Sequence, residues 1–87
     1  MNWQEIRQRY PHRWLVVEAI GAYTEGAARV IPHLEVLGEF NQDHDAARAY
    51  YRQAHRQNKM RELYVLHTDR EELNIRVMNA FRVLIEG

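Results

Sequence analysis

The chain has 87 residues, with 12 basic and 12 acidic side chains and a formal net charge of zero at neutral pH. This length predicts a single domain over residues 1–87 with one hydrophobic core. The apolar share of 46% is typical of a folded chain rather than a disordered one. A zero net charge provides no overall field to attract nucleic acid or an anionic membrane surface.

Missing residue types exclude several kinds of functional site. The chain has no cysteine and no serine, which excludes disulfides, thiolate metal sites and a Ser-His-Asp triad. Lys59 is the sole lysine and the four glycines are scattered, so neither a P-loop nor a dinucleotide fingerprint is present. We therefore expect no cofactor. No apolar run approaches the length of a membrane span, and we expect a cytoplasmic protein without a membrane partner.

The first quarter of the chain predicts a short helix followed by a strand. Trp3 and Ile6 have near-helical spacing within residues 2–9, and Asn2 is suited to the N-cap. Residues 13–23 form a nearly continuous apolar run with β-branched and aromatic members. Such a run is typical of a central strand covered on both faces.

A second strand is predicted over residues 29–40, after a turn at Thr24–Gly26. Apolar and polar residues alternate along this segment, which is typical of a half-exposed strand. Pro32 lacks an N–H to donate to a neighbouring strand, so the strand should lie at a sheet edge, or be bulged or interrupted at this residue.

The next segments predict the main helix and a third strand. Residues 41–45 supply caps and negative charge for a helix that extends to about Gln57, with small alanines on one face. Residues 61–67 form a second apolar run. A strand–helix–strand order favours a right-handed crossover, so 29–40 and 61–67 should be parallel.

The end of the chain is ambiguous in sequence. Thr68–Glu71 matches a capping box and predicts one helical turn. Residues 74–86 fit either a strand or a helix, and we favour the strand. The sequence thus predicts an α+β fold of the order α-β-β-α-β plus a C-terminal strand or helix. Its small mixed β-sheet should carry one main helix on a face.

Glu18 is a candidate site residue because it interrupts an apolar strand. A carboxylate desolvated in a sheet either has a raised pKa or pairs with a partner. A perturbed acid in a pocket would be a functional candidate. The alternative is that Glu18 pairs with an arginine on a neighbouring element, and we favour this structural role.

His67 and Asp69 follow the third strand, where ligands of α/β sheets often bind. A hydrolase using His67, Asp69 and Glu18 as acid–base groups is the sharpest enzyme hypothesis that the sequence offers. The alternative is a histidine that only satisfies hydrogen bonds at the strand end. We favour this alternative and expect a protein without catalytic residues.

Neither the histidines nor the acidic residues predict a metal site. The spacing of the five histidines, at positions 12, 33, 44, 55 and 67, matches no recognised metal-binding motif. Asp43 and Asp45 flank His44, but the calcium-loop pattern is absent. We interpret these acids as helix caps.

Arg48, Arg52 and Arg56 recur every fourth residue of the main helix and should form a stripe on one face. Such a stripe can bind phosphates, so weak nucleic-acid binding is one hypothesis. The solvated face of an amphipathic helix has the same pattern, and we favour that interpretation.

Two features favour self-association. The aromatic residues exceed what so small a core needs, and tyrosine and tryptophan are frequent at interface centres. An uncovered edge strand can also pair with the same strand of a second copy. We therefore expect a homodimer more than any enzyme.

Several segments resemble a family of small bacterial proteins with no assigned function. The resemblance covers residues 3 to about 73 and is carried by Trp3–Ile6, Trp14–Ala19, Arg61–Val65 and Arg70–Leu73. It implies a bacterial cytosolic protein and carries no active site. The sequence thus favours a non-enzymatic, self-associating interaction module, with the nucleic-acid binder and the hydrolase as alternatives.

Overall fold

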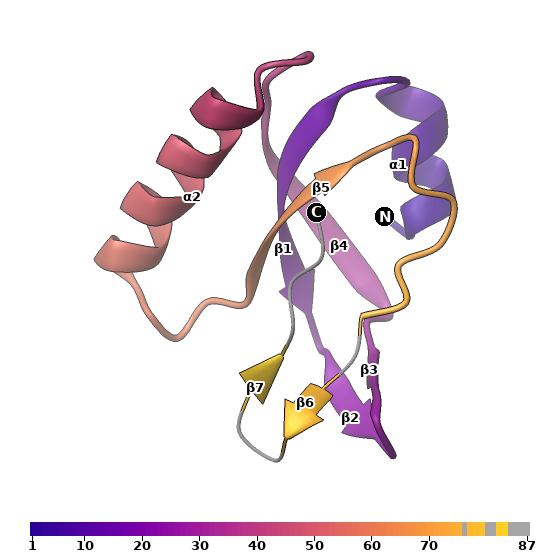
Figure 1. Cartoon of the computed structure of the whole chain (residues 1–87). Helices are drawn as coiled ribbons and strands as arrows, with labels where there is room; N and C mark the ends of the chain where they lie inside the picture. Colours follow the sequence, from indigo (N-terminus) through magenta and orange to yellow (C-terminus); the bar gives the residue numbers. More distant parts are fainter. Residues whose placement is uncertain (76, 80–81, 84–87) are drawn as a thin grey trace.

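The computed structural model describes residues 1–75, 77–79 and 82–83 of the chain. The elements follow one another as α1 (Trp3–Arg9), β1 (Trp14–Ile20), β2 (Tyr23–Glu25), β3 (Ala28–Val30), β4 (His33–Glu39), α2 (His44–Gln57), β5 (Leu63–His67), β6 (Val77–Asn79) and β7 (Arg82–Val83). The predicted α+β class is confirmed, and the main helix, α2, packs against the sheet (Figure 1).

The main sheet has three strands in the order β4-β1-β5, and β1 is antiparallel to both neighbours. β4 and β5 therefore run in the same direction, as the crossover through α2 predicted. β1 lies between them, however, so each described pair of neighbouring strands is antiparallel and the mixed pairing is wrong. β1 is central because it is the most apolar run, and its neighbours protect it from solvent.

The two faces of the sheet are covered by different helices. Alternate side chains of β1 point to opposite faces, and Leu15 and Val17 pack in one cluster with Ile6 of α1. Val16 packs on the other face with Ala47 of α2 and Val65 of β5. The prediction that residues 13–23 form a strand covered on both faces is confirmed for Trp14–Ile20. Figure 1 shows the sheet between the two helices.

Local signals define both helices. Asn2 caps α1 by accepting from Glu5 N, and the Glu5 side chain accepts from Asn2 N, which completes a capping box. Asp43 caps α2 through Ala46 N, in agreement with the prediction. The small residues Ala47 and Ala54 are buried, so α2 lies close to the sheet.

The segment predicted as one strand over 29–40 is divided at Pro32. β3 ends at Val30 and pairs with β2 in a separate hairpin, and β4 begins at His33. The turn of this hairpin lies at Gly26 and Ala27, slightly later than predicted, because Gly26 adopts a positive φ of 62°. The expected interruption at Pro32 is thus confirmed, and β4 is an edge strand.

β4 contains a bulge. The register passes from Val17↔Val36 to Val16↔Gly38, so Leu37 is the extra residue. The bulge lets Val36 pack on the α1 face and Leu37 pack on the α2 face. The Phe40 ring then folds back over Gly38, where an added Cβ would lie 2.9 Å from the ring.

The expected helical turn at Thr68–Glu71 is wrong. The Thr68 hydroxyl accepts from Arg13 N at 3.0 Å and Thr68 N donates to Arg13 O, so this residue extends the β1–β5 pairing instead of capping a helix. Within residues 74–86, the described parts 77–79 and 82–83 form the β6–β7 hairpin, as the favoured strand interpretation predicted. The rest of that prediction, apart from 74 and 75, lies outside the described residues. No helix in the described ranges is both long enough and apolar enough to cross a membrane.

Candidate functional site

Glu18 pairs with an arginine, as the favoured interpretation predicted. Arg61 Nε donates to Glu18 Oε2 at 3.2 Å, and Arg61 Nη2 donates to Oε1 at 2.8 Å. The hydrogen bond from Arg61 lowers the pKa of Glu18 below its ordinary value, and desolvation opposes this only in part. Glu18 is therefore a charged structural partner of Arg61 and not a protonated acid.

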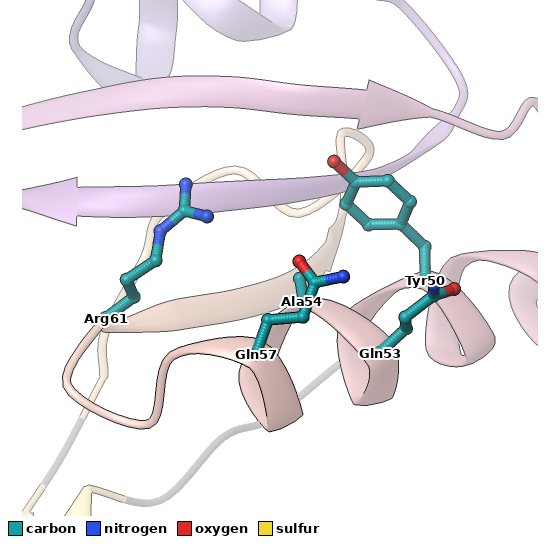
Figure 2. A pocket seen from close by; sticks show the side chains of 5 residues that line it. All are labelled: Tyr50, Gln53, Ala54, Gln57 and Arg61. Carbon is teal, nitrogen blue, oxygen red and sulfur yellow. The ribbon is translucent and has the colours of Figure 1, made fainter.

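A shallow groove lies beside this ion pair. It encloses about 180 Å³ and is lined by Tyr50, Gln53, Ala54, Gln57 and Arg61. Figure 2 shows Tyr50 and Arg61 at its two ends, with the glutamines of α2 between them. Tyr50 also contacts the Phe40 ring, with 5.5 Å between ring centroids. The groove therefore follows the flank of α2 that faces β4.

His67 and Asp69 lie together at the other end of β1, and His12 joins them. His12 Nδ1 lies 2.6 Å from Asp69 Oδ1, while His67 Nδ1 lies 3.8 Å from Asp69 Oδ2. The side chains of His12 and Asp69 are 78% and 60% exposed, so this pair is held in solvent and not in a pocket. An exposed ion pair of this kind contributes little to stability.

The hydrogen bonds of His67 define a structural role. Asp69 N donates to His67 Nδ1 at 3.1 Å, and His67 Nε2 lies 3.2 Å from Gln42 Oε1. The Gln42 amide donates to His12 O, which orients its oxygen toward His67. Both ring nitrogens of a neutral His67 with the proton on Nε2 are then satisfied. This agrees with the favoured prediction for the strand end.

The hydrolase residues do not meet in one place. Glu18 pairs with Leu63, whereas His67 pairs with Trp14 at the opposite end of β1. The two positions are four residue steps apart along β1, which corresponds to roughly 13 Å. The structure thus brings together His67 and Asp69 but leaves Glu18 apart.

Two of the histidines near this end of the sheet pack on Trp14. The ring centroids of His44 and His67 lie 4.2 Å and 5.0 Å from that of Trp14. In the described part of the chain, no group of histidine and acidic side chains has the geometry to hold a metal ion.

The arginine stripe faces solvent. Arg48, Arg52 and Arg56 are all exposed, while Ala47 and Ala54, on the side of α2 toward the sheet, are buried. This arrangement is that of an amphipathic helix.

Sequence reasoning missed a partly buried ionic network on the α1 face. Arg29 of β3 donates from Nη2 and Nε to the two carboxylate oxygens of Glu62, at 2.5 Å and 3.0 Å. The buried Tyr64 hydroxyl donates to Glu62 Oε2 at 2.5 Å, and Arg29 Nη1 donates to Thr24. The network ties the β2–β3 hairpin to the start of β5.

Electrostatics keep this network charged. Desolvation acts to raise the pKa of Glu62, but the hydrogen bonds from Arg29 and Tyr64 outweigh it and lower the pKa. Burial and the contact with the Glu62 carboxylate raise the pKa of Tyr64. No local signal marks this group, because Arg29 and Glu62 lie 33 residues apart in sequence.

The outer edge of β5 carries unpaired main-chain groups. Ala19 N donates to Glu62 O and Thr68 N donates to Arg13 O, so even-numbered residues from 62 to 68 bond to β1. In antiparallel pairing the intervening residues point their N–H and C=O groups away from that neighbour. Leu63, Val65 and His67 therefore present these groups outward, and no described strand pairs with them. Of these groups, His67 O already accepts from Arg70 N at 3.1 Å in the turn that follows β5.

The outer edge of β4 is partly closed. Leu34 N donates to Met1 O at 2.8 Å, and the Met1 ammonium donates to Leu34 O at 3.0 Å. The bulge at Leu37 then disrupts the ladder, and Glu35 and Glu39 are exposed along the strand. Bulges and edge charges are common means of preventing a strand from pairing with another chain.

Comparison of the chain with models of known protein families, with curated proteins and with solved structures found no match. The resemblance to small bacterial proteins therefore stays a prediction.

Proposed function

We propose that this chain is a cytoplasmic, non-enzymatic interaction module of bacterial origin that self-associates by pairing β5 with β5 of a second copy. The observation that carries the proposal is the edge of β5. Its outward main-chain groups at Leu63, Val65 and His67 have no described strand beside them. The bacterial origin and the location rest on the sequence alone.

β5 suits a symmetric antiparallel pair. If the twofold axis passes at Val65, all five strand residues pair, and Leu63 lies opposite His67 of the second copy. The central Val65 pair would form two hydrogen bonds. Each Leu63–His67 pair would form one, because His67 O already accepts from Arg70 N, so the total is about four interchain bonds. Residues 63–66 are apolar or aromatic and include neither a proline nor a charge that would oppose pairing.

The register also places opposite charges across the interface. Arg61 precedes β5 by two residues and Asp69 follows it by two, so each Arg61 lies at the same end of the interface as Asp69 of the second copy. This pairing occurs twice because of the symmetry.

The geometry favours this function over the two alternatives. The hydrolase hypothesis needs Glu18 beside His67, and the two lie at opposite ends of β1. The arginine stripe is exposed, but an exposed stripe is equally typical of a solvated helix face.

The test combines sedimentation equilibrium with residue-resolved amide exchange. We expect a mass above the 10.5 kDa monomer at high concentration. We also expect the amides of Val65 and His67 to become protected as concentration rises. The amide of Val36, whose N–H points away from β1 on β4, is the internal control, and its exchange rate should not change. A protein that stays monomeric at every concentration up to about 1 mM would overturn the proposal. That result would mean that the association free energy is weaker than about 4 kcal/mol.

A further inference from the structure

We propose that α2 supplies the second half of this interface, through a flank formed by Arg48, Tyr51 and His55. On this view the flank packs against the same flank of the second copy, with the Arg48 guanidinium on the partner's Tyr51 ring. The inference rests on the proposed pairing of β5 and specifies the other surface that the second copy contacts.

The orientation of α2 identifies the flank. Ala47 points at the sheet, in one cluster with Val16 and Val65. At about 100° per residue, Tyr50 lies on one side of Ala47 and Tyr51 on the other. Tyr50 contacts Phe40 at the end of β4, so its side faces β4. The Tyr51 side therefore faces the outer edge of β5.

Arg48 and His55 point most directly toward a second copy. Both lie about 80–100° around the helix from Ala47 on the Tyr51 side. Tyr51 and His55 are already stacked, with ring centroids 5.7 Å apart and planes inclined by 11°. The flank thus offers a preformed aromatic surface beside a cation, and tyrosine and arginine are enriched at interface centres.

The distance between the two helices suits direct packing. α2 packs on both β1 and β5, and neighbouring strands lie about 4.8 Å apart. Pairing β5 with its counterpart would therefore place the two α2 axes roughly 10 Å apart on the same face of a continuous sheet. Packed helices lie about 8–10 Å apart.

The levels along the helix then determine which residues meet. Ala47 and Tyr51 both pack in the cluster that contains Val65, so a twofold axis at Val65 passes between the levels of Arg48 and Tyr51. Because the axis reverses the second helix, Tyr51 of one copy lies opposite Arg48 of the partner subunit. A guanidinium over a tyrosine face is a favourable cation–π contact. The twofold symmetry forms this contact twice, and each contact draws one Arg48 away from the other.

Single-cysteine cross-linking tests this contact, because the chain has no cysteine of its own. Arg48→Cys places a thiol close to its counterpart across the axis. Arg56→Cys is the matched control, since it is an exposed arginine on the same helix that points to solvent, about 180° from Ala47. We expect the Arg48→Cys variant to form a disulfide-linked dimer at least about tenfold faster than the control, since only close Cβ atoms form the bond.

A second measurement uses dimer dissociation. Tyr51→Ala should raise the dimer Kd about tenfold through loss of the cation–π contact, while Gln53→Ala, on the opposite flank, should leave it unchanged. Equal cross-linking of the two cysteine variants, in a dimer with protected β5 amides, would reject the helix contact alone. A protein that stays monomeric would reject both the helix contact and the pairing of β5.

Discussion

The two edges of the main sheet differ in how they are finished. β4 is bridged by Met1, bulged at Leu37 and preceded by Pro32. β5 has none of these features, yet ion pairs hold the residues just before it, Arg61 with Glu18 and Glu62 with Arg29. An unpaired edge is therefore not necessarily a loose one. β5 is fixed by side chains at its start and stays available along its main chain.

The largest expected effect comes from proline at the centre of the β5 edge. Val65→Pro removes an outward N–H that β1 does not use, so the monomer should fold while the dimer Kd rises at least about 100-fold. Val36→Pro makes the matched change on β4 and should leave the dimer Kd unchanged. Sedimentation gives both values, and circular dichroism checks the fold. Similar dimerisation of both variants would remove the distinction between the edges.

The ion pairs next to the two edges should differ in strength. Glu62→Gln leaves Arg29 and Tyr64 without their charged partner, and we expect a loss of about 2–3 kcal/mol in unfolding free energy. Glu39→Gln changes the Arg13–Glu39 pair beside β4, whose side chains are 34% and 45% exposed. That loss should stay below about 1 kcal/mol. Urea denaturation measures both, and equal losses would contradict the anchoring of β5.

Opening the β4 edge should change the assembly. A chain that starts at Trp3 lacks the Met1 bridge and the Asn2 cap, and should lose about 1–2 kcal/mol of stability. With both edges unpaired it should also form species larger than a dimer. Asn2→Ala is the control that loses the cap and keeps the bridge. Light scattering that finds the same species for both chains would show that Met1 does not close the edge.

The smallest effect concerns acid stability at the start of β5. The Arg61 hydrogen bond lowers the pKa of Glu18 below 4.5, so its stabilisation is present above that pH and is lost as pH falls through the lower folded pKa. Glu18→Gln should lower the unfolding free energy by about 1 kcal/mol at neutral pH. It should also weaken the pH dependence of stability in the acid range. Thermal unfolding between about pH 3 and pH 7 measures this. An unchanged acid limb would contradict a charged Glu18.

Local features of the fold were predictable from sequence. The caps Asn2 and Asp43 and the break at Pro32 depend on residues within a turn of each other, and all three are confirmed. The helical turn predicted at Thr68 was wrong because the Thr68 hydroxyl accepts from Arg13 N, which is distant in sequence, and does not cap the turn that follows. The mixed sheet was wrong for a similar reason, since pairing depends on which strands become neighbours. β1 lies between β4 and β5, so the two parallel strands do not pair with each other.

The candidate site shows the same limit. The sequence predicted that Glu18 pairs with an arginine, but Arg61 was identified only by the register of β1 and β5. The Arg29–Glu62–Tyr64 network was missed, because its members come from two sheets. The outward positions of β5 could not be assigned before its neighbour was known, since a shift of one residue would reverse them.

Position 38 requires glycine for lack of space and not because of its backbone angles. It is not among the residues with a positive φ, yet a methyl group there would overlap the Phe40 ring, whose nearest atoms lie 2.9 Å and 3.0 Å away. Phe40 in turn contacts Tyr50 of α2, so even alanine at position 38 would shift the position of α2 on the sheet. The spacing of helix and sheet is thus set by the smallest residue of the strand.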